Sequence, residues 1–436
     1  TQCGNPKRYF HQAALHPLPL TALAKGRART SRWIKAACIA VDTSLRLFFL
    51  GRAMVASFSI DANCLRIPQP CYTARMLETI AVEPQCAGFS PSRLSDAVAF
   101  ALANEINWSR NIDDQLGKGE FEPPPWNEIL GPTTPRGGPA GVIMRHGQVA
   151  ATWGDVMRAD MTFSVAKSYL AILTGLALAD GLIVDINDRV ADTSLDDHFS
   201  SAQNRDITWL HLLQQTSEWE GTLFSKSDLI DRNRQLGAEP DNSRKGQHRD
   251  LGAPGSHWEY NDVRVNRLSL SLLHLFRRSL ADVLRERIME PIGASNDWSW
   301  NAYRNATVTI DGVEMPSVPG GSHWGGGLWI GASDQAKLGQ LILQRGAWDD
   351  RQLLAEGWID AMFTPCAINP EYGYMWWLNT DRARYSSASA GAVAAVGAGG
   401  NTILVEPAHD LVLVARWLRG TALDPLIAQT IAAIRE

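Results

Sequence analysis

The chain has 436 residues, of which 45% are hydrophobic and 20% are charged, so its composition is ordinary for a soluble globular protein with ample material for a core. A net charge of −5, without a basic cluster in the folded part, excludes a nucleic-acid-binding protein. The six cysteines show neither metal-ligand spacing nor a disulfide framework, and we expect no metal site and no cofactor.

Residues 1–75 are interpreted as an N-terminal appendage whose order the sequence does not define. Their most hydrophobic part, residues 36–60, is interrupted by Asp42, Arg46 and Arg52, which are too many charges for a membrane span. There is also no clean signal peptide, so we expect no membrane span and a cytoplasmic location. Met76, shortly before the first regular pattern, would be a natural start of the protein.

Regular patterns begin at Ser90, which we expect to cap a helix from Pro91 to about residue 107. After a proline-rich connector, residues 141–144 and 149–153 predict a β-hairpin. A long apolar helix follows, with Thr162 as its predicted cap.

The middle of the chain, residues 182–300, is predicted to be mostly helical. The polar segment 226–254 within it is interpreted as a surface excursion. The expected helices of this part are 208–215, 262–278 and 280–289. Strand character returns near the end, where a hairpin of residues 401–405 and 411–417 precedes a helix from about 424 to 435.

Strands at both ends of the chain with helices between them predict an α+β fold. We expect an antiparallel sheet built from residues 76–181 and 301–436, flanked by the N- and C-terminal helices. A mostly helical domain of residues 182–300 would be inserted into it, with the active site between the two domains.

The most informative motif is Ser164-Val165-Ala166-Lys167 at the start of the apolar helix. Residues three positions apart share a helix face, so the hydroxyl and the amine can meet. A hydroxyl becomes a good nucleophile when a neighbour takes its proton, and an amine in an apolar helix is one such neighbour. The helix N-terminus adds backbone N–H groups that favour a developing oxyanion. A solvated lysine on a helix flank is the alternative interpretation.

Three further segments contain candidate site residues. Tyr260 stands where a Gly/Pro loop enters a helix, and a tyrosine beside an ammonium group can accept a proton from serine and return it to a leaving group. The small residues 391–401 can expose backbone N–H groups for an oxyanion hole, or form only a flexible linker. The loop 320–327 can line a cleft, or only let chain segments pack closely.

Taken together, Ser164, Lys167, Tyr260 and the glycine-rich strand before the C-terminal hairpin resemble the serine β-lactamase and penicillin-binding-protein superfamily. The similar branches are class C β-lactamase-like proteins, family VIII carboxylesterases and 6-aminohexanoate-dimer hydrolases. The resemblance covers roughly residues 85–436 and implies the β-lactamase/transpeptidase-like fold. The run of residues 212–219 is similar to the LLxHTSG stretch that leads to the cleft in this group.

The resemblance implies roles for these residues. Ser164 would be the acylated nucleophile, Lys167 would assist its deprotonation, and Tyr260 would be general base and then general acid. The backbone N–H groups of Ser164 and of Ala398 would form the oxyanion hole. The residues expected to bind substrate are Trp219, Asp262, Trp324 and Trp377.

Two departures from the family pattern bear on the substrate. Asp262 stands where the Y-x-N element has Asn, with Asn261 beside it, and a carboxylate there changes the local charge. The K-T-G strand aligns with residues 395–397, which are Ala, Val and Gly, so no cation meets a β-lactam carboxylate. Neutral esters or amides therefore become favoured substrates over penicillins.

The sequence thus predicts a serine hydrolase that cleaves small carboxylic esters through a Ser164 acyl-enzyme. An amidase or β-lactamase acting on cyclic or linear amides is the alternative within the same chemistry. A non-catalytic binding protein with this fold is the alternative outside it. An α/β-hydrolase is disfavoured because no G-x-S-x-G motif occurs. The expected partner is a small-molecule ester, and the oligomeric state is left open.

Overall fold

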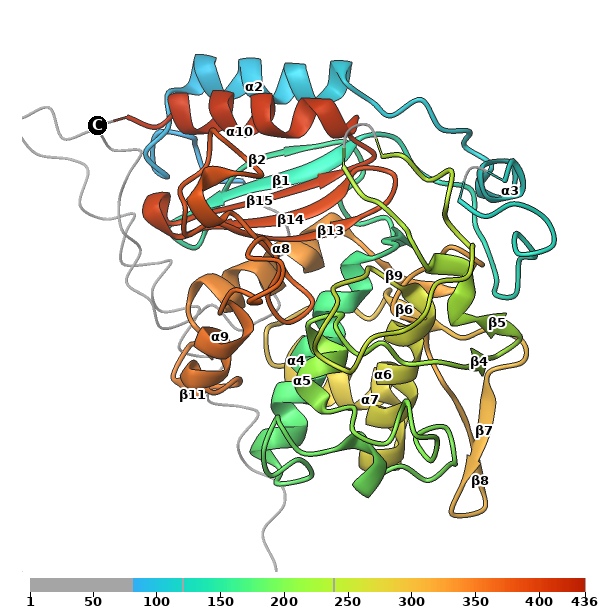
Figure 1. Cartoon of the computed structure of the whole chain (residues 1–436). Coiled ribbons are helices and arrows are strands. Elements are labelled where there is room, and N and C mark those ends of the chain that lie inside the picture. Colours follow the sequence, from blue (N-terminus) through green and yellow to red (C-terminus); the bar gives the residue numbers. More distant parts are fainter. Residues whose placement is uncertain (1–80, 120, 238–239, 436) are drawn as a thin grey trace, which may run out of the picture. The chain divides into compact units, whose positions relative to one another are not determined.

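The structure is a computed structural model, and it describes residues 81–119, 121–237 and 240–435 (Figure 1). The N-terminal appendage and the proposed start at Met76 lie outside these residues. Within the described part of the chain, no helix is both long enough and apolar enough to cross a membrane.

A six-stranded antiparallel sheet joins the N- and C-terminal parts of the chain. Its strand order is β12-β13-β14-β15-β1-β2. The strands are β1 (Ala140–Arg145), β2 (Gln148–Trp153), β12 (Trp377–Leu378), β13 (Val393–Gly397), β14 (Asn401–Glu406) and β15 (Leu411–Arg416). Both predicted hairpins are confirmed, and the pairing of β1 with β15 closes the sheet between segments far apart in sequence.

Helices cover both faces of this sheet. The helices α2 (Pro91–Ala103) and α10 (Leu423–Ala432) pack together on one face, and α8 (Ala332–Leu343) packs on the other against β14 and β15 (Figure 1). Burial on both sides explains why residues 403–405 of β14 and 411–415 of β15 are continuous apolar runs and not alternating ones. Gly339 allows the close approach of α8, because a Cβ there would lie 2.6 Å from the Val412 side chain.

The central helix of the molecule is α4 (Val165–Ala179), which is buried on all sides from Val165 to Ala177. It packs against β13 and against α6 (Asp262–Phe276). The other helices are α3 (Ile112–Gly117), α5 (Trp209–Leu213), α7 (Leu280–Leu284) and α9 (Glu356–Met362). A π-helical turn over Arg285–Met289 continues α7, where the sequence predicts a single α-helix.

Short strands make up the rest of the β-structure. A three-stranded sheet has the order β3-β9-β6 and holds the segment that leads into α4. Its strands are β3 (Asp160–Met161), β6 (Ser299–Asn301) and β9 (Gly327–Ile330). The two-stranded pairs are β4 (Thr222–Leu223) with β5 (Lys226–Ser227), β7 (Thr307–Ile310) with β8 (Val313–Pro316), and β10 (Ala347–Trp348) with β11 (Arg351–Gln352).

Two local predictions are wrong. Thr162 does not cap α4, because its hydroxyl donates to the Leu328 carbonyl and Ser164 occupies the N-cap position. The first part of the polar segment 226–254 is not a surface excursion either. Lys226, Asp231 and Arg232 are buried, because they form ion pairs and hydrogen bonds beside α6.

Candidate active site

Ser164 and Lys167 meet at the N-terminus of α4. The Lys167 Nζ lies 2.8 Å from the Ser164 Oγ, as their spacing on one helical turn predicts. The residue before the serine, Phe163, has a φ of 52°, which is unusual for a bulky side chain. Its ring is held by aromatic contacts with Trp108 and Trp417, so packing maintains the sharp turn that presents Ser164.

Lys167 is almost fully buried, and its ammonium group is surrounded by polar atoms. Besides Ser164, the Nζ contacts the Asp262 carboxylate and lies 3.4 Å from the Gly320 carbonyl oxygen. A Cβ at Gly321 would lie 3.3 Å from the same Nζ. The loop 320–327 thus packs directly against the lysine.

Tyr260 precedes α6 and lies beside Lys167, with the Nζ 4.8 Å from the centre of its ring. The ring stacks on Trp377 at 5.7 Å and meets Tyr372 edge to face at 6.2 Å. No hydrogen bond joins the Tyr260 hydroxyl to another residue in the described part of the chain. The Tyr260 side chain is almost fully buried.

The strand β13 ends beside the nucleophile. A Cβ at Gly397 would lie 2.0 Å from the Thr162 carbonyl oxygen and 3.1 Å from the Ser164 amide nitrogen, so only glycine permits this approach. Neither the Ser164 nor the Ala398 amide donates a hydrogen bond to another backbone group of the described residues. Two unpaired N–H groups at this junction are what an oxyanion hole requires.

Asp262 is the centre of a buried charge cluster at the other side of Lys167. Its carboxylate contacts Lys167, accepts from Arg234 at 2.8 Å, and lies 3.0 Å from the His323 Nδ1. Burial alone would raise the pKa of Asp262, but the positive charges of Lys167, His323 and Arg234 outweigh it and hold that pKa well below its usual value. Burial would lower the pKa of His323, and the neighbouring Asp262 carboxylate raises it instead.

Three more charged residues complete this cluster. They are Glu122, Asp231 and Lys245. Arg234 lies between Asp231 and Asp262, and its guanidinium carbon is 5.2 Å from the centre of the Tyr260 ring. Sequence reasoning missed both Arg234 and His323, because neither belongs to a local motif and only the fold brings them to the lysine.

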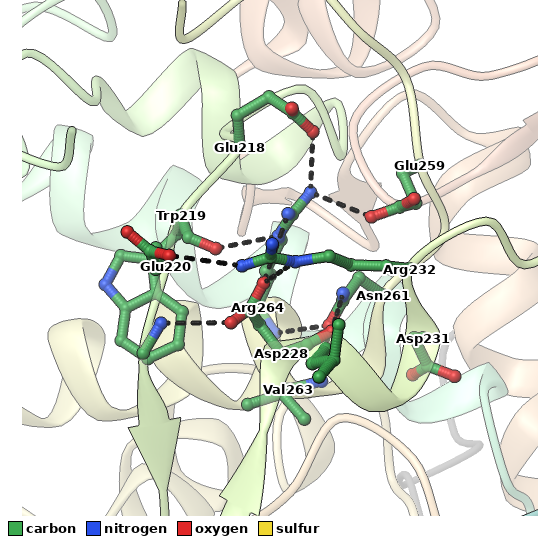
Figure 2. Close-up of polar contacts among 12 residues, drawn as sticks. Glu218, Trp219, Glu220, Asp228, Asp231, Arg232, Glu259, Asn261, Val263 and Arg264 are labelled. Carbon is green, nitrogen blue, oxygen red and sulfur yellow. Dashed lines mark hydrogen bonds and ion pairs between the residues drawn. The ribbon is translucent and has the colours of Figure 1, made fainter. Parts of the chain in front are cut away.

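A second buried cluster holds the turn that carries Tyr260 (Figure 2). Arg264 on α6 pairs with Glu218, Asp228 and Glu259, which come from three different segments. Asn261 caps α6 by accepting from the Val263 and Arg264 amides. Because its carbonyl oxygen is used in this cap, Asn261 does not replace the missing Asn of the Y-x-N element.

The four residues expected to bind substrate lie in different surroundings. Trp219 and Trp324 have no exposed surface, and their indole N–H groups donate to the backbone carbonyls of His198 and Trp126. They pack inside the protein in this structure and cannot contact a substrate there. Trp377 lies between Tyr260 and Arg384, whose guanidinium carbon is 3.9 Å from its ring centre. Asp262 contacts Lys167, as described above.

The described residues contain no group of three or more His, Cys, Asp or Glu side chains that could hold a metal ion. The polar atoms around Ser164 belong to side chains and backbone amides. A hydroxyl, an ammonium group, a phenol and two unpaired N–H groups are sufficient for acyl transfer.

Comparison with known proteins identifies the family and the fold. Residues 136–421 match the family model described as Beta-lactamase. The solved structure of EstCE1, described as a hydrolase with promiscuous acyltransferase activity, is 16% identical, and the match covers 79% of this chain and 99% of that chain with a TM-score of 0.50. A penicillin-binding protein homologue from Caulobacter crescentus is 17% identical, with the same coverage and a TM-score of 0.50. At these identities the two structures show a shared fold. No curated protein sequence matches this chain.

Proposed function

Because the chain belongs to the β-lactamase family of hydrolases, whose model matches well over half of its length, we propose that it is a serine hydrolase that cleaves small carboxylic esters. The observation that carries the proposal is the 2.8 Å contact of the Ser164 Oγ with the Lys167 Nζ beside two unpaired backbone N–H groups. A buried lysine that contacts a serine at a helix N-terminus is the arrangement that activates a hydroxyl.

In acylation, the Ser164 Oγ–H bond breaks and the proton passes to the oxygen of Tyr260 in its phenolate form. The Oγ forms a bond to the carbonyl carbon of the ester, and the electron pair moves to the carbonyl oxygen. The amides of Ser164 and Ala398 stabilise this oxyanion. Collapse breaks the bond to the alcohol, which leaves with the proton from Tyr260. Water then hydrolyses the acyl-enzyme by the same proton path.

Esters are favoured over penicillins because β13 has no basic side chain at the position of the family's K-T-G lysine. Residues 394–397 are Ala, Ala, Val and Gly, so the strand beside the nucleophile cannot pair with a substrate carboxylate. Esters also have better leaving groups than amides. Alcohol departure therefore needs less proton assistance than amine departure.

The test is hydrolysis of p-nitrophenyl butyrate with mass spectrometry of the trapped protein. We expect a burst of nitrophenol and an acyl adduct on Ser164. The Ser164→Ala variant should lose on the order of 10⁴-fold in kcat/KM. Ser168→Ala is the matched control, since this serine lies on the same helix but its hydroxyl donates to the Met375 carbonyl.

Two outcomes would change the proposal. Equal activity of the Ser164→Ala variant and the wild type would remove Ser164 from its role. Turnover of nitrocefin or of a linear amide faster than that of the ester would favour the amidase or β-lactamase alternative.

A further inference from the structure

A pocket with apolar walls lies beside the proposed catalytic residues. We propose that this pocket holds an uncharged aromatic group of the ester, carried by either its acyl or its alcohol part, and that Trp126 and Leu236 determine the preference for that group. This inference rests on the proposed function and adds to it the class of ester.

The pocket lies between two segments that are far apart in the sequence, residues 121–126 and the segment that follows the short helix Asp228–Asp231. Its volume is about 580 Å³, which is within the range of roughly 300–1,000 Å³ that is typical of small-molecule sites. An acetyl group is far too small to fill such a space. The side chains that give the pocket its character are Phe121, Trp126, Ile230, Leu236, Arg234 and Lys245.

The walls offer aromatic and aliphatic surface to a ligand. Phe121 and Trp126 are half-buried, and Ile230 is buried behind them. Leu236 is 41% exposed, so it presents apolar surface that a ligand could remove from water. Aromatic rings attract one another beyond the effect of burial alone, so two aromatic wall residues favour an aryl group over an alkyl group of similar size.

The two cations that line the pocket are already paired with carboxylates. Arg234 contacts Asp231 and Asp262. Lys245 contacts Glu122 at 2.6 Å and Asp231 at 3.3 Å. Because each buried charge has its partners within the protein, a ligand does not have to supply a negative charge here.

Hydrogen bonds to the backbone hold the walls in place. The Lys245 Nζ donates to the Phe121 carbonyl oxygen at 2.6 Å and thereby joins the two segments. The Trp126 carbonyl oxygen accepts from the Lys226 Nζ at 2.9 Å and from the Trp324 Nε1 at 2.8 Å. The walls are therefore fixed before a ligand binds, which lowers the entropic cost of binding. Substitution of the Trp126 side chain leaves these backbone bonds possible.

One wall of the pocket borders the turn that presents the nucleophile. The Phe121 ring stacks on Phe163, the residue before Ser164, with ring centres 6.3 Å apart. Phe121 and Ala398 also pack against the same small apolar cluster, which contains Phe163. A group that lies on Phe121 is thus close to the serine and to the proposed oxyanion hole.

Arg234 connects the pocket with Tyr260. It lines the pocket, and its guanidinium carbon is 5.2 Å from the centre of the Tyr260 ring. The pocket is therefore bordered by residues that contact both the serine turn and the proposed general base. An ester whose carbonyl carbon lies at Ser164 can extend an aryl group into it.

Hydrolysis of three simple esters tests the inference and identifies the part of the ester that enters the pocket. Ethyl acetate is the reference, ethyl phenylacetate carries an aryl group on the acyl side, and benzyl acetate carries one on the alcohol side. Acid release gives kcat/KM for each, divided by the rate of hydrolysis by hydroxide to remove differences in intrinsic reactivity. We expect at least one aryl ester to exceed ethyl acetate at least about tenfold.

Two variants of the walls should reduce this preference. Trp126→Ala removes an aromatic wall, and Leu236→Glu places a charge on an apolar one. Each should lower the ratio of kcat/KM for the preferred aryl ester to that for ethyl acetate at least about fivefold. A general structural defect would lower both values equally and leave the ratio unchanged. Leu195→Glu is the matched control, because Leu195 is 48% exposed and lies outside the pocket, and it should keep the wild-type ratio.

A preference for neither aryl ester, or the wild-type ratio in both wall variants, would overturn the inference. Binding to the Ser164→Ala variant separates it from the proposed function. We expect ethyl phenylacetate or benzyl acetate to change the tryptophan fluorescence of this variant, with a Kd that Leu236→Glu raises at least about fivefold. Such binding without hydrolysis by the wild type would support the pocket and refute the hydrolase.

Discussion

The Glu218 carboxylate provides a stability prediction whose magnitude follows from the structure. Glu218 is fully buried, and both its oxygens lie 2.7 Å from the Arg249 guanidinium, while Arg264 lies at 3.1 Å. The backbone φ of Glu218 is 49°, which is strained for a residue with a side chain. Figure 2 shows its carboxylate within the buried cluster. In the LLxHTSG stretch of the family this position is a glycine, which adopts such a φ without strain.

The contribution of this ion-pair cluster can be worked out from the pKa of Glu218. Burial would raise this pKa, but hydrogen bonds and charges from Arg249 and Arg264 lower it from its ordinary value of 4.5 to about 2. That difference corresponds to about 3 kcal/mol of stability at neutral pH. Because the folded-state pKa is lowered, this stability is present above about pH 4.5 and is lost as the pH falls toward 2.

Urea denaturation followed by tryptophan fluorescence tests this reasoning. We expect Glu218→Gln to lower the free energy of unfolding by about 3 kcal/mol at pH 7. At pH 3.5 the difference in the free energy of unfolding between the variant and the wild type should be about 1 kcal/mol smaller than at pH 7. Glu220→Gln is the matched control, because Glu220 lies in the same cluster but is 58% exposed and 3.5 Å from Arg232. Its loss should be about 1 kcal/mol or less. Equal losses in the two variants would refute the argument.

Two further predictions concern the site itself. The pKa of His323 is raised in the folded protein, so its pairing with Asp262 stabilises the fold below about pH 6.5. This stabilisation is lost as the pH rises through the folded-state pKa. His323→Gln should therefore lower the melting temperature more at pH 6 than at pH 9. A larger deficit at pH 9 would contradict this sign. Gly397→Ala places a Cβ 2.0 Å from the Thr162 carbonyl oxygen, so β13 must move away from Ser164. We expect kcat to fall about 100-fold with a smaller change in KM, measured by steady-state ester hydrolysis, and an unchanged kcat would argue against an oxyanion role for this junction.

The elements that the sequence predicts best are those with strong local signals. Each of the two hairpins consists of short strands rich in apolar residues that a short turn separates. Ser164 and Lys167 lie on one turn of a buried helix, so their proximity follows from helix geometry alone. Tyr260 was placed beside them by the resemblance and not by a local rule. The structure puts its ring 4.8 Å from the lysine nitrogen.

The features that the sequence did not indicate depend largely on long-range contacts. Trp219 and Trp324 lie next to residues that are typical of loops. Nothing in this local sequence indicates that their indole N–H groups donate to carbonyls of distant residues, or that both side chains are buried. Arg234 lies in a polar stretch that is typical of a surface. Its guanidinium is largely enclosed, because Asp231 on the preceding turn and Asp262 on α6 compensate its charge, and periodicity cannot report the contact with Asp262.

The same compensation changes how position 262 bears on substrate choice. From the sequence, a carboxylate in place of the family's Asn adds negative charge and argues against anionic substrates. In the structure that carboxylate contacts three groups that carry or can carry positive charge, namely Lys167, Arg234 and His323. Its field is therefore largely cancelled inside the cluster, and repulsion by Asp262 is too weak to exclude an anion. The proposed preference for neutral esters over anionic substrates thus depends on the missing cation of β13 alone.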